Sequence, residues 1–483
     1  MHASVGKLAS GAGCGTSGHA ARGSSGQGVP TGARRGRQSE MSANTPTVAG
    51  LERDAQQAMG DHKVHPNEIA IGVVIGRASE YFDFFVFGIA CVLVFPKVYF
   101  PFVDPLKGTL YAFSIFALAF IARPLGTVLF MAIDRRHGRS VKLTTALFLL
   151  GGSTAAVSFL PRYDSIGISA VYILAGLRIL QGLALGGAWD GLASLLAMNA
   201  PRERRGWYAM IPQLGAPLGF MVASALFAFF IVNLDEADFI DWGWRFPFYC
   251  AFTINVVALF ARLRLVATDE FARMMDLDRL RPVPALELFR HHAGDVVRGA
   301  FVPLAAFALF HLVTIFPIAW LALNSTTRSP GEFLIVQFSG AIVCAGAVAA
   351  SGLIADQIGR RNCLIMSSSL IGFFAVGSII APLLFGESAI GQTIYVTIGF
   401  MLLGLAYGQT AGAVSARLGN RYRYTGAALT SDFAWLIGAG FAPLVALFLS
   451  QRYGLAMIGV YLLSGAVCSL VALFTDRSEL RQM

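Results

Sequence analysis

The first long apolar run of the chain, Ile69 to Phe95, contains one charged stretch: Gly76-Arg77-Ala78-Ser79-Glu80-Tyr81-Phe82-Asp83-Phe84-Phe85-Val86-Phe87-Gly88. At helical pitch Arg77, Glu80 and Asp83 follow one another at three-residue spacing, so neighbours in the series share a side of the helix and can pair. An acid or base at a bilayer centre costs roughly 2.5 to 3.5 kcal/mol, and such groups mostly face a protein interior or a water-filled cavity. We therefore interpret this helix as the start of a transport pathway.

The composition is that of a polytopic membrane protein. Hydrophobic residues make up 55% of the 483 residues and charged residues only 13%, whereas a soluble domain has about 25% charged residues. Mean hydropathy is +0.63. A spanning helix needs about 20 mostly apolar residues, and twelve runs approach or exceed that length: 69–95, 109–133, 143–160, 166–198, 207–232, 246–266, 300–323, 333–354, 364–385, 390–413, 427–450 and 455–474.

The runs predict an all-α membrane protein with twelve transmembrane helices in two six-helix bundles. We expect a disordered cytoplasmic N-terminal tail, an N-terminal bundle, a cytoplasmic connector, a C-terminal bundle and a cytoplasmic tail, over 1–66, 67–266, 267–298, 299–475 and 476–483. The first 60 residues are rich in Gly, Ser and Ala and lack a periodicity that could bury a core. They do not resemble a secretory signal; a transit peptide or an over-long start before Met41 remain alternatives.

Positive charge lies in the loops and sets the expected orientation. The formal net charge is +9, but the Lys and Arg residues cluster after the second, fourth, eighth and tenth runs and in the connector. By the positive-inside rule both termini and the connector are cytoplasmic, and a nucleic-acid partner is not expected. The six cysteines are scattered without metal-ligand or paired spacing, so we predict no metal site.

The two halves echo each other. Gly138-Arg139 recurs 221 residues later as Gly359-Arg360, and the basic approach to Gly206 recurs 220 residues later before Gly426. A near-constant offset over two loops indicates a duplicated six-helix unit, as expected for a transporter whose halves rock about a central site.

Residues 352–361, Gly-Leu-Ile-Ala-Asp-Gln-Ile-Gly-Arg-Arg, resemble the signature loop of the major facilitator superfamily, Gly-x-x-x-Asp-x-x-Gly-Arg-Arg. Further segments resemble the metabolite:proton symporter family, and the resemblance covers about 68–474; these segments are 80–84, 122–126, 178–182, 186–187, 213–219, 242–245 and 421–426. Three segments depart from the family pattern. Asp134 stands one place early, Ala188 replaces a glutamate while an acid appears at Asp190, and Asp432 stands where an amide is usual.

Four carboxylates inside apolar runs are the candidates for proton coupling: Glu80, Asp83, Asp190 and Asp432. Ionised and unpaired, they would together cost about 10 to 14 kcal/mol, so each must be protonated, paired or wetted. Burial can raise a carboxyl pKa by up to about 3 to 5 units, which would let such an acid load and release a proton. The alternative is a fixed ion pair with Arg77, Arg123 or Arg178 that only orders the helices.

Candidate substrate-binding residues are polar or basic groups placed within the runs: Arg123, Arg178, Gln181, Gln213, Tyr407 and Gln409. Arg123 lies too deep in its span for easy snorkelling, and it could hold either an anionic substrate or Asp83. His311 is either a satisfied core group or a proton relay. The aromatic residues around Asp83 and Trp435 are interpreted as packing rather than as a ligand cage.

Two basic loops are candidates for conformational gates. Their residues, Asp134, Arg135, Gly138, Arg139, Asp356, Gly359, Arg360 and Arg361, lie at the expected cytoplasmic ends of helices. A carboxylate at a helix terminus with an opposing Arg can lock two halves together and release them. Anchoring of the topology by positive charge is the simpler role of the same residues.

We hypothesise a secondary transporter of the inner membrane that moves a small polar or carboxylated metabolite with protons by alternating access. The chain is expected to act as a monomer in the lipid bilayer without a cofactor. ATP does not drive it directly because the sequence has no phosphate-binding Gly-x-x-x-x-Gly-Lys-Ser/Thr motif, and an enzyme is not expected because no nucleophile–base arrangement appears. Proton-driven export and a substrate sensor that does not transport are the alternatives.

Overall fold

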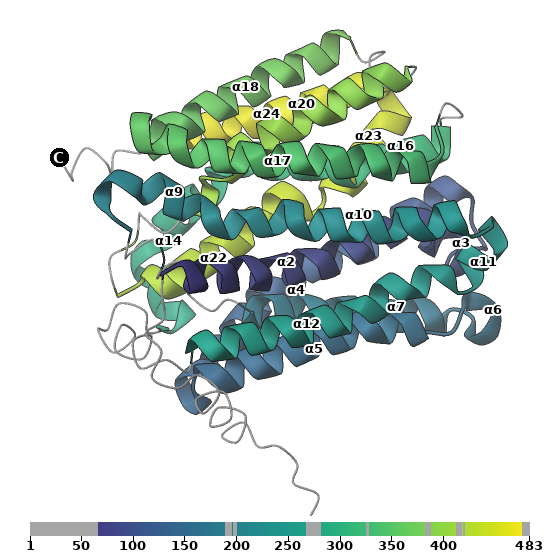
Figure 1. Ribbon diagram of the computed structural model, residues 1–483, viewed down its shortest axis with the longest axis horizontal. Helices are drawn as coiled ribbons and strands as arrows, with labels where there is room; N and C mark the ends of the chain where they lie inside the picture. Colours follow the sequence, from purple (N-terminus) through teal and green to yellow (C-terminus); the bar gives the residue numbers. More distant parts are fainter. Residues whose placement is uncertain are drawn as a thin grey trace, which may run out of the picture. The chain divides into compact units, whose positions relative to one another are not determined.

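The computed structural model describes residues 66–188, 196, 200–266, 282–324, 328–381, 388–411, 418 and 421–475. All of them belong to one unit of the chain, Thr47–Met483. Within these residues the regular structure is entirely helical (Figure 1). The predicted fold class is therefore confirmed, and the predicted tails lie outside the described residues.

In the described part of the first half, six long helices or helix groups are joined by short ones. Its elements are α2 (Pro66–Leu93), α3 (Phe95–Val98), α4 (Pro105–His137), α5 (Arg139–Phe159), α6 (Tyr163–Ile166), α7 (Ser169–Gly187), η1 (Arg202–Arg204), α9 (Arg205–Met210), η2 (Ile211–Leu214), α10 (Gly215–Asn233), α11 (Glu236–Asp241), η3 (Gly243–Arg245) and α12 (Phe246–Val266).

The second half repeats this plan after a helix that begins inside the predicted connector. Its elements are α14 (Ala285–Phe301), α15 (Leu304–Thr314), α16 (Phe316–Asn324), α17 (Pro330–Ile358), α18 (Arg360–Ile380), α20 (Ala389–Tyr407), α22 (Arg423–Trp435), the π-helical η4 (Leu436–Gly440), α23 (Ala442–Tyr453) and α24 (Ala456–Phe474).

Eleven spans in the described residues are long and apolar enough to cross a membrane, and they coincide with eleven of the twelve predicted runs. The remaining run is α2, which is 28 residues long and differs from the others by carrying Arg77, Glu80 and Asp83. Charge thus sets α2 apart from the other spans, as its sequence indicated.

Within the residues that the structure describes, three of the predicted spans are interrupted helices rather than continuous ones. The fifth consists of α9, η2 and α10, the seventh of α15 and α16, and the eleventh of α22, η4 and α23. A proline stands at each break, Pro212, Pro317 and Pro443. Proline lacks a backbone N–H and clashes with the preceding turn, which explains why the regular helix stops there although the apolar run continues.

The paired Gly-Arg motifs mark equivalent turns in the two halves. Gly138 separates α4 from α5 with φ of 86°, and Gly359 separates α17 from α18 with φ of 85°. Positive φ is readily adopted only by glycine. The same backbone requirement at both positions agrees with a duplicated helical unit.

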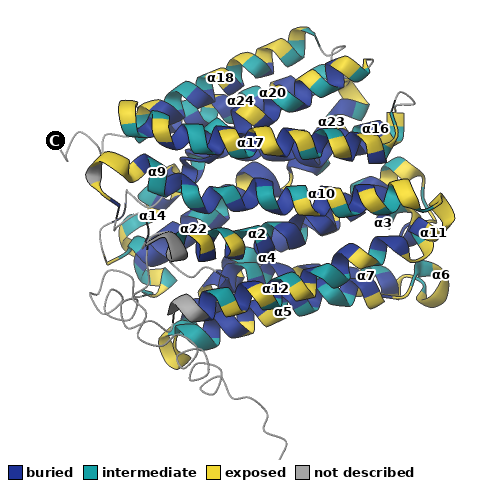
Figure 2. Ribbon diagram, in the orientation of Figure 1, coloured by how far each residue is buried: buried dark blue, intermediate teal, exposed yellow. Residues whose placement is uncertain are grey.

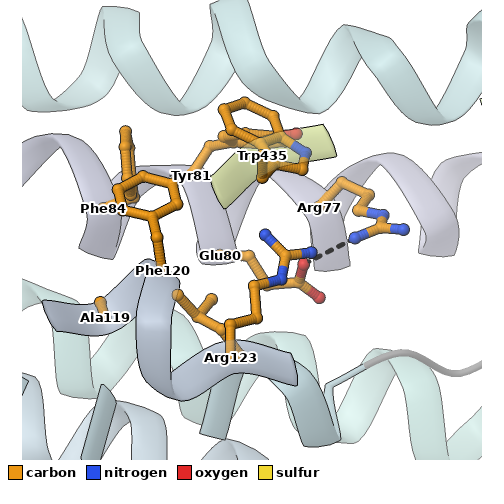
Figure 3. A pocket seen from close by; sticks show the side chains of 9 residues that line it. Arg77, Glu80, Tyr81, Phe84, Ala119, Phe120, Arg123 and Trp435 are labelled. Atoms are coloured by element: carbon orange, nitrogen blue, oxygen red, sulfur yellow. Dashed lines mark hydrogen bonds and ion pairs between the residues drawn. The ribbon is translucent and has the colours of Figure 1, made fainter. Parts of the chain in front are cut away.

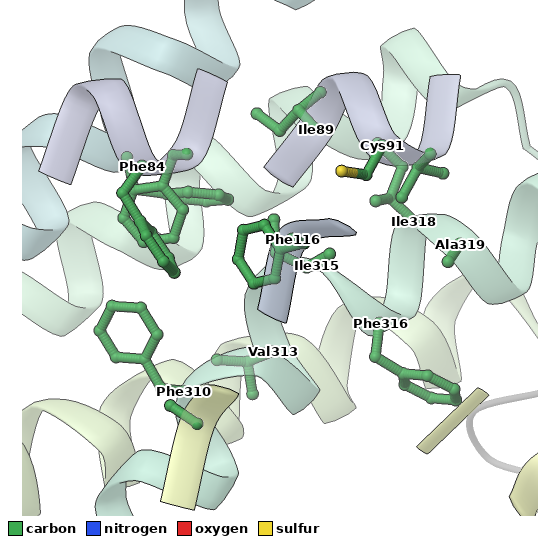
Figure 4. Packing of buried hydrophobic residues seen from close by; sticks show 14 of the residues in the cluster. Phe84, Ile89, Cys91, Phe116, Phe310, Val313, Ile315, Phe316, Ile318 and Ala319 are labelled. Atoms are coloured by element: carbon green, nitrogen blue, oxygen red, sulfur yellow. The ribbon is translucent and has the colours of Figure 1, made fainter. Parts of the chain in front are cut away.

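Apolar side chains cover both the interior and the outside of the helices. Figure 2 shows exposed residues along the outward faces of α7, α10, α17 and α18, and these faces carry large apolar side chains such as Tyr172, Phe229 and Phe373. Such a surface fits a lipid environment. At the centre every residue of α15 is buried, and Phe310 of that helix packs in the cluster that also contains Phe84 (Figure 4).

Candidate functional site

A small cavity lies where α2, α4, α7 and α22 meet. Charged side chains gather toward one end and aromatic rings toward the other (Figure 3). The lining residues are Arg77, Glu80, Tyr81, Phe84, Ala119, Phe120, Arg123, Leu185 and Trp435. The centre of a water molecule can move within about 20 Å³ of the cavity. This volume holds about one or two waters. The cavity therefore lies between the two halves and, in this conformation, has room for only a few atoms.

Glu80 is held by two arginines. Its Oε2 lies 2.8 Å from Nη1 of Arg77, one turn earlier on α2, and its Oε1 accepts a hydrogen bond from Nη2 of Arg262 on α12. Arg262 is buried and also donates to the backbone carbonyl of Ala188, 3.1 Å away. The predicted alternative of an ion pair with Arg77 is thus confirmed for Glu80. Arg262 was not among the residues predicted from the sequence. A charge inside the sixth apolar run, 246–266, could have identified it as a functional candidate.

Asp432 forms the ion pair that joins the two halves at the cavity. Its Oδ1 lies 2.7 Å from Nε of Arg123, and its Oδ2 accepts from the hydroxyl of Thr127, so α22 is tied to α4 by both oxygens. The sequence had offered Asp83 or a substrate as partners of Arg123. Among described protein groups the partner is Asp432, and the Asp83 alternative is wrong because these two side chains make no ion pair.

Asp83 is buried but belongs to no ion pair among the described residues. Its Oδ2 accepts a hydrogen bond of 2.6 Å from the side-chain amide of Asn255 on α12. The nearby Arg178 donates instead to Gln181 and to the carbonyl of Phe116, at 2.9 and 3.2 Å. Asp83 thus accepts a hydrogen bond from a neutral amide, whereas the sequence had left an ion pair with an arginine as an alternative.

Arg178 and Gln181 form an internal network rather than part of the cavity wall. The guanidinium lies over the rings of Phe87 and Phe116, 4.2 and 4.6 Å from their centres, and Gln181 donates to Thr154 over 3.1 Å. Both side chains are buried. Cation–π contacts and hydrogen bonds thus compensate the buried charge, which favours an ordering role for this pair in the present conformation.

The other three predicted substrate residues bridge the halves outside the cavity lining. Gln213 donates to Thr410 over 3.0 Å, and Gln409 donates to the carbonyl of Gly206 over 3.2 Å. The hydroxyl of Tyr407 hydrogen-bonds to that of Tyr81, which does line the cavity. These contacts place all three at the interface between the two halves.

The gate loop of the second half binds a helix end of the first. Oδ1 of Asp356 accepts from the backbone N–H of Gly206 over 2.6 Å, and its Oδ2 accepts from that of Trp207 over 3.3 Å. Free N–H groups and the positive end of the dipole make the start of a helix a site for a carboxylate. A Cβ on Gly206 would lie only 2.8 Å from Oδ1, so glycine permits this approach.

The gate arginines hold backbone carbonyls. Arg360 donates to the carbonyl of Arg205 over 3.5 Å, and Arg361 donates to that of Leu473 over 3.0 Å. The first of these contacts joins the halves, and the second lies within the second half.

The gate loop of the first half uses side chains instead of a helix end. Asp134 lies 3.6 Å from Nε of Arg139 and 3.5 Å from Nζ of Lys142, and it accepts from the hydroxyl of Tyr424 over 3.4 Å. Lys142 also donates to Tyr424 over 2.8 Å. The loop therefore meets the start of α22, whereas Arg135 is exposed. Tyr424 and Lys142 were not among the predicted gate residues.

Asp190, the remaining candidate for proton coupling, lies outside the described residues. His311 is buried against the rings of Phe84, Phe116 and Phe310, with centroid distances of 5.4 to 5.5 Å, and neither ring nitrogen has a hydrogen-bond partner within the described structure. It is therefore not the satisfied core group that one alternative supposed.

Known proteins resemble this chain over most of its length. The family model described as Major Facilitator Superfamily matches residues 73–443. The inner membrane metabolite transport protein YhjE of Escherichia coli (strain K12) is 34% identical over 423 residues, which cover 86% of this chain and 95% of the relative. The shikimate transporter of the same organism is 30% identical over 415 residues, covering 83% and 92%.

A solved structure shows the same fold. The crystal structure of a D-xylose-proton symporter matches with a TM-score of 0.64 and 16% sequence identity, over 85% of this chain and 97% of that chain.

Proposed function

Because the chain belongs to the major facilitator superfamily, whose matched members are transporters and not enzymes, we propose that it is a proton-coupled symporter for a small carboxylated metabolite. It works by alternating access as a monomer of the inner membrane, with both termini in the cytoplasm and without a cofactor. The proton gradient supplies the driving force.

The observation that carries the proposal is the environment of Asp83. The side chain is buried, and its hydrogen-bond donor is the neutral amide of Asn255 on α12 of the same half. An ionised carboxylate without a counter-ion is expensive at membrane depth, whereas a protonated one is not. Among the candidate coupling acids that the structure describes, Asp83 is therefore the one that can take up a proton in one state and release it in another without breaking an ion pair.

The cavity supports a carboxylated substrate. Arg77 and Arg123 both line it, and guanidinium groups bind carboxylates with two parallel hydrogen bonds. The rings of Phe84, Phe120 and Trp435 supply an apolar surface for the rest of the molecule. The similarity to the shikimate transporter points in the same direction, because shikimate carries a carboxylate on a ring.

The energetics suit proton coupling. One proton charge moved through about 100 mV supplies about 2.3 kcal/mol, which corresponds to roughly fifty-fold accumulation of a neutral solute. A monoanion moved with one proton gains nothing from the voltage, so a carboxylate relies on the pH difference or on additional protons.

Transport in proteoliposomes tests the proposal. Vesicles containing the protein receive an imposed pH gradient and radiolabelled shikimate or glycine betaine outside, with D-xylose as the control that lacks a carboxylate. Symport predicts uptake of one of the carboxylated solutes together with internal acidification. The Asp83→Asn variant should lose the acidification.

The same vesicles separate the alternatives. Solute and proton fluxes in opposite directions would identify an exporter. Binding of a carboxylate without counterflow would identify a sensor, and either result would overturn symport.

A further inference from the structure

The ion pair between Arg123 and Asp432 suggests a further role for Asp432. We propose that Asp432 binds Arg123 at the position that the substrate carboxylate takes when substrate is bound. Asp432 then takes up a proton when the substrate carboxylate binds Arg123. This inference rests on the proposed function, because it names the group that the substrate contacts and the acid that competes for it.

Arg123 stands between the cavity and Asp432. It lines the cavity, whereas Asp432 does not. Its side chain retains 14% of its exposure compared with 3% for Asp432, and their contact of 2.7 Å uses the Nε side of the guanidinium. Guanidinium offers five N–H donors, and Asp432 is its one ion-pair partner among the described residues. A second carboxylate in the cavity would therefore meet the same cation.

Two ionised carboxylates on one guanidinium repel each other, since like charges disfavour each other's ionised form. A proton on Asp432 removes that repulsion and loosens its hold on Arg123. A proton on Asp432 therefore raises the affinity of Arg123 for a second carboxylate. By linkage, a bound carboxylate raises the proton affinity of Asp432 by the same factor.

Besides Arg123, the described groups that act on Asp432 are Arg77 on α2 and Thr127 on α4, and Glu80 lines the same cavity as Arg123. Glu80 is already held by Arg77 and Arg262, and Thr127 is neutral. Of the described carboxylates at this end of the cavity, Asp432 is thus the one whose release frees Arg123 for a substrate.

The pair also ties the halves, because Arg123 lies on α4 and Asp432 on α22. Exchange of Asp432 for a substrate carboxylate removes a direct bond between the halves and replaces it with a bond to the solute. Substrate, proton and movement of the halves are thereby linked at one arginine.

Formate tests the inference, because it is the smallest carboxylate and suits a cavity with room for about one or two waters. Thermal unfolding of the detergent-purified full-length protein is compared in formate and in chloride at equal ionic strength, at pH 5.5 and 7.5. Formate is ionised at both values. In the Asp432→Asn variant we expect formate to raise Tm by about 2 °C or more over chloride at both pH values.

Matched variants identify the binding group. The formate effect should disappear in the Arg123→Gln/Asp432→Asn double variant, and Asp356→Asn, which removes a carboxylate that joins the halves elsewhere, should respond like the wild type. Equal formate effects in wild type and Asp432→Asn at pH 7.5, or a response that survives in the double variant, would overturn the inference.

The wild type alone gives a second test that needs no folded variant. Its formate effect should be larger at pH 5.5 than at 7.5, since a proton must occupy Asp432, and an effect independent of pH would contradict the inference. Failure of both shikimate and glycine betaine transport with an intact formate response would instead count against the proposed function and leave the carboxylate site standing.

Discussion

Glu80 and Asp83 are carboxylates one turn apart on α2, and their surroundings differ in charge. Glu80 lies between Arg77 and Arg262, whereas Asp83 faces the amide of Asn255. Breaking a buried ion pair by removing one partner costs about 3 to 5 kcal/mol, because the other charge is left uncompensated. The comparison indicates that the first carboxylate orders the helices and that the second is able to change its charge.

The strongest test of this contrast is Glu80→Gln. The substitution removes the buried carboxylate that both Arg77 and Arg262 contact, so we expect the free energy of unfolding to fall by about 3 to 5 kcal/mol. Denaturation of the purified protein by SDS measures the change. The control is Glu236→Gln, which removes an exposed ion pair with Lys97 and should cost less than about 1 kcal/mol. Equal losses in the two variants would contradict the assignment of Glu80.

An intermediate effect is expected for Asn255→Leu. The substitution removes the hydrogen-bond donor of Asp83 and keeps a side chain of similar size, so the free energy of unfolding should fall by about 1 to 3 kcal/mol. The same denaturation assay applies. In an Asp83→Leu background the loss should shrink, since both polar partners are then gone; an undiminished loss would show that Asn255 acts through other contacts.

A smaller effect is expected for Arg77→Gln. Arg262 still holds Glu80, so the loss should stay well below the loss of about 3 to 5 kcal/mol expected for removal of Glu80 itself. Arg262→Gln is the matched variant, because it removes the buried member of the pair and should cost several times more. A larger loss of stability in Arg77→Gln than in Arg262→Gln would identify Arg77 as the main counter-ion of Glu80.

The smallest change in stability is expected for Asp83→Asn. No ion pair is lost, and the new amide oxygen can accept from Asn255, so the free energy of unfolding should change by less than about 1 kcal/mol. Proton-driven uptake in vesicles should nevertheless fall at least tenfold while counterflow persists. Retained proton dependence would remove Asp83 from the coupling step.

Local patterns predicted much of this architecture. Apolar run length located the spans, and the three-residue spacing of Arg77 and Glu80 predicted their ion pair, because both features depend on neighbouring residues. The turns at Gly138 and Gly359 are likewise local features, because a backbone with positive φ favours glycine.

Long-range partners could not be predicted in the same way. Arg262 lies 182 residues from Glu80, and Thr127 lies 305 residues from Asp432. Helical periodicity says which face a side chain shares along one helix, but it does not say which helix packs against that face. The departure at Asp432 was noticed in the sequence, whereas its bond to Arg123 required the packing of α22 on α4.

The π-helical turn η4 follows directly after Trp435 and connects α22 to α23. A π turn closes its hydrogen bonds one residue further along than an α turn. The five residues 436–440 thereby form a turn with one more residue than an α turn has. Asp432 in α22 faces Arg123 of α4 just before this turn, and α23 continues the span after it. The spacing of the eleventh span, as much as its side-chain chemistry, therefore brings an acid and an indole to the centre of the protein.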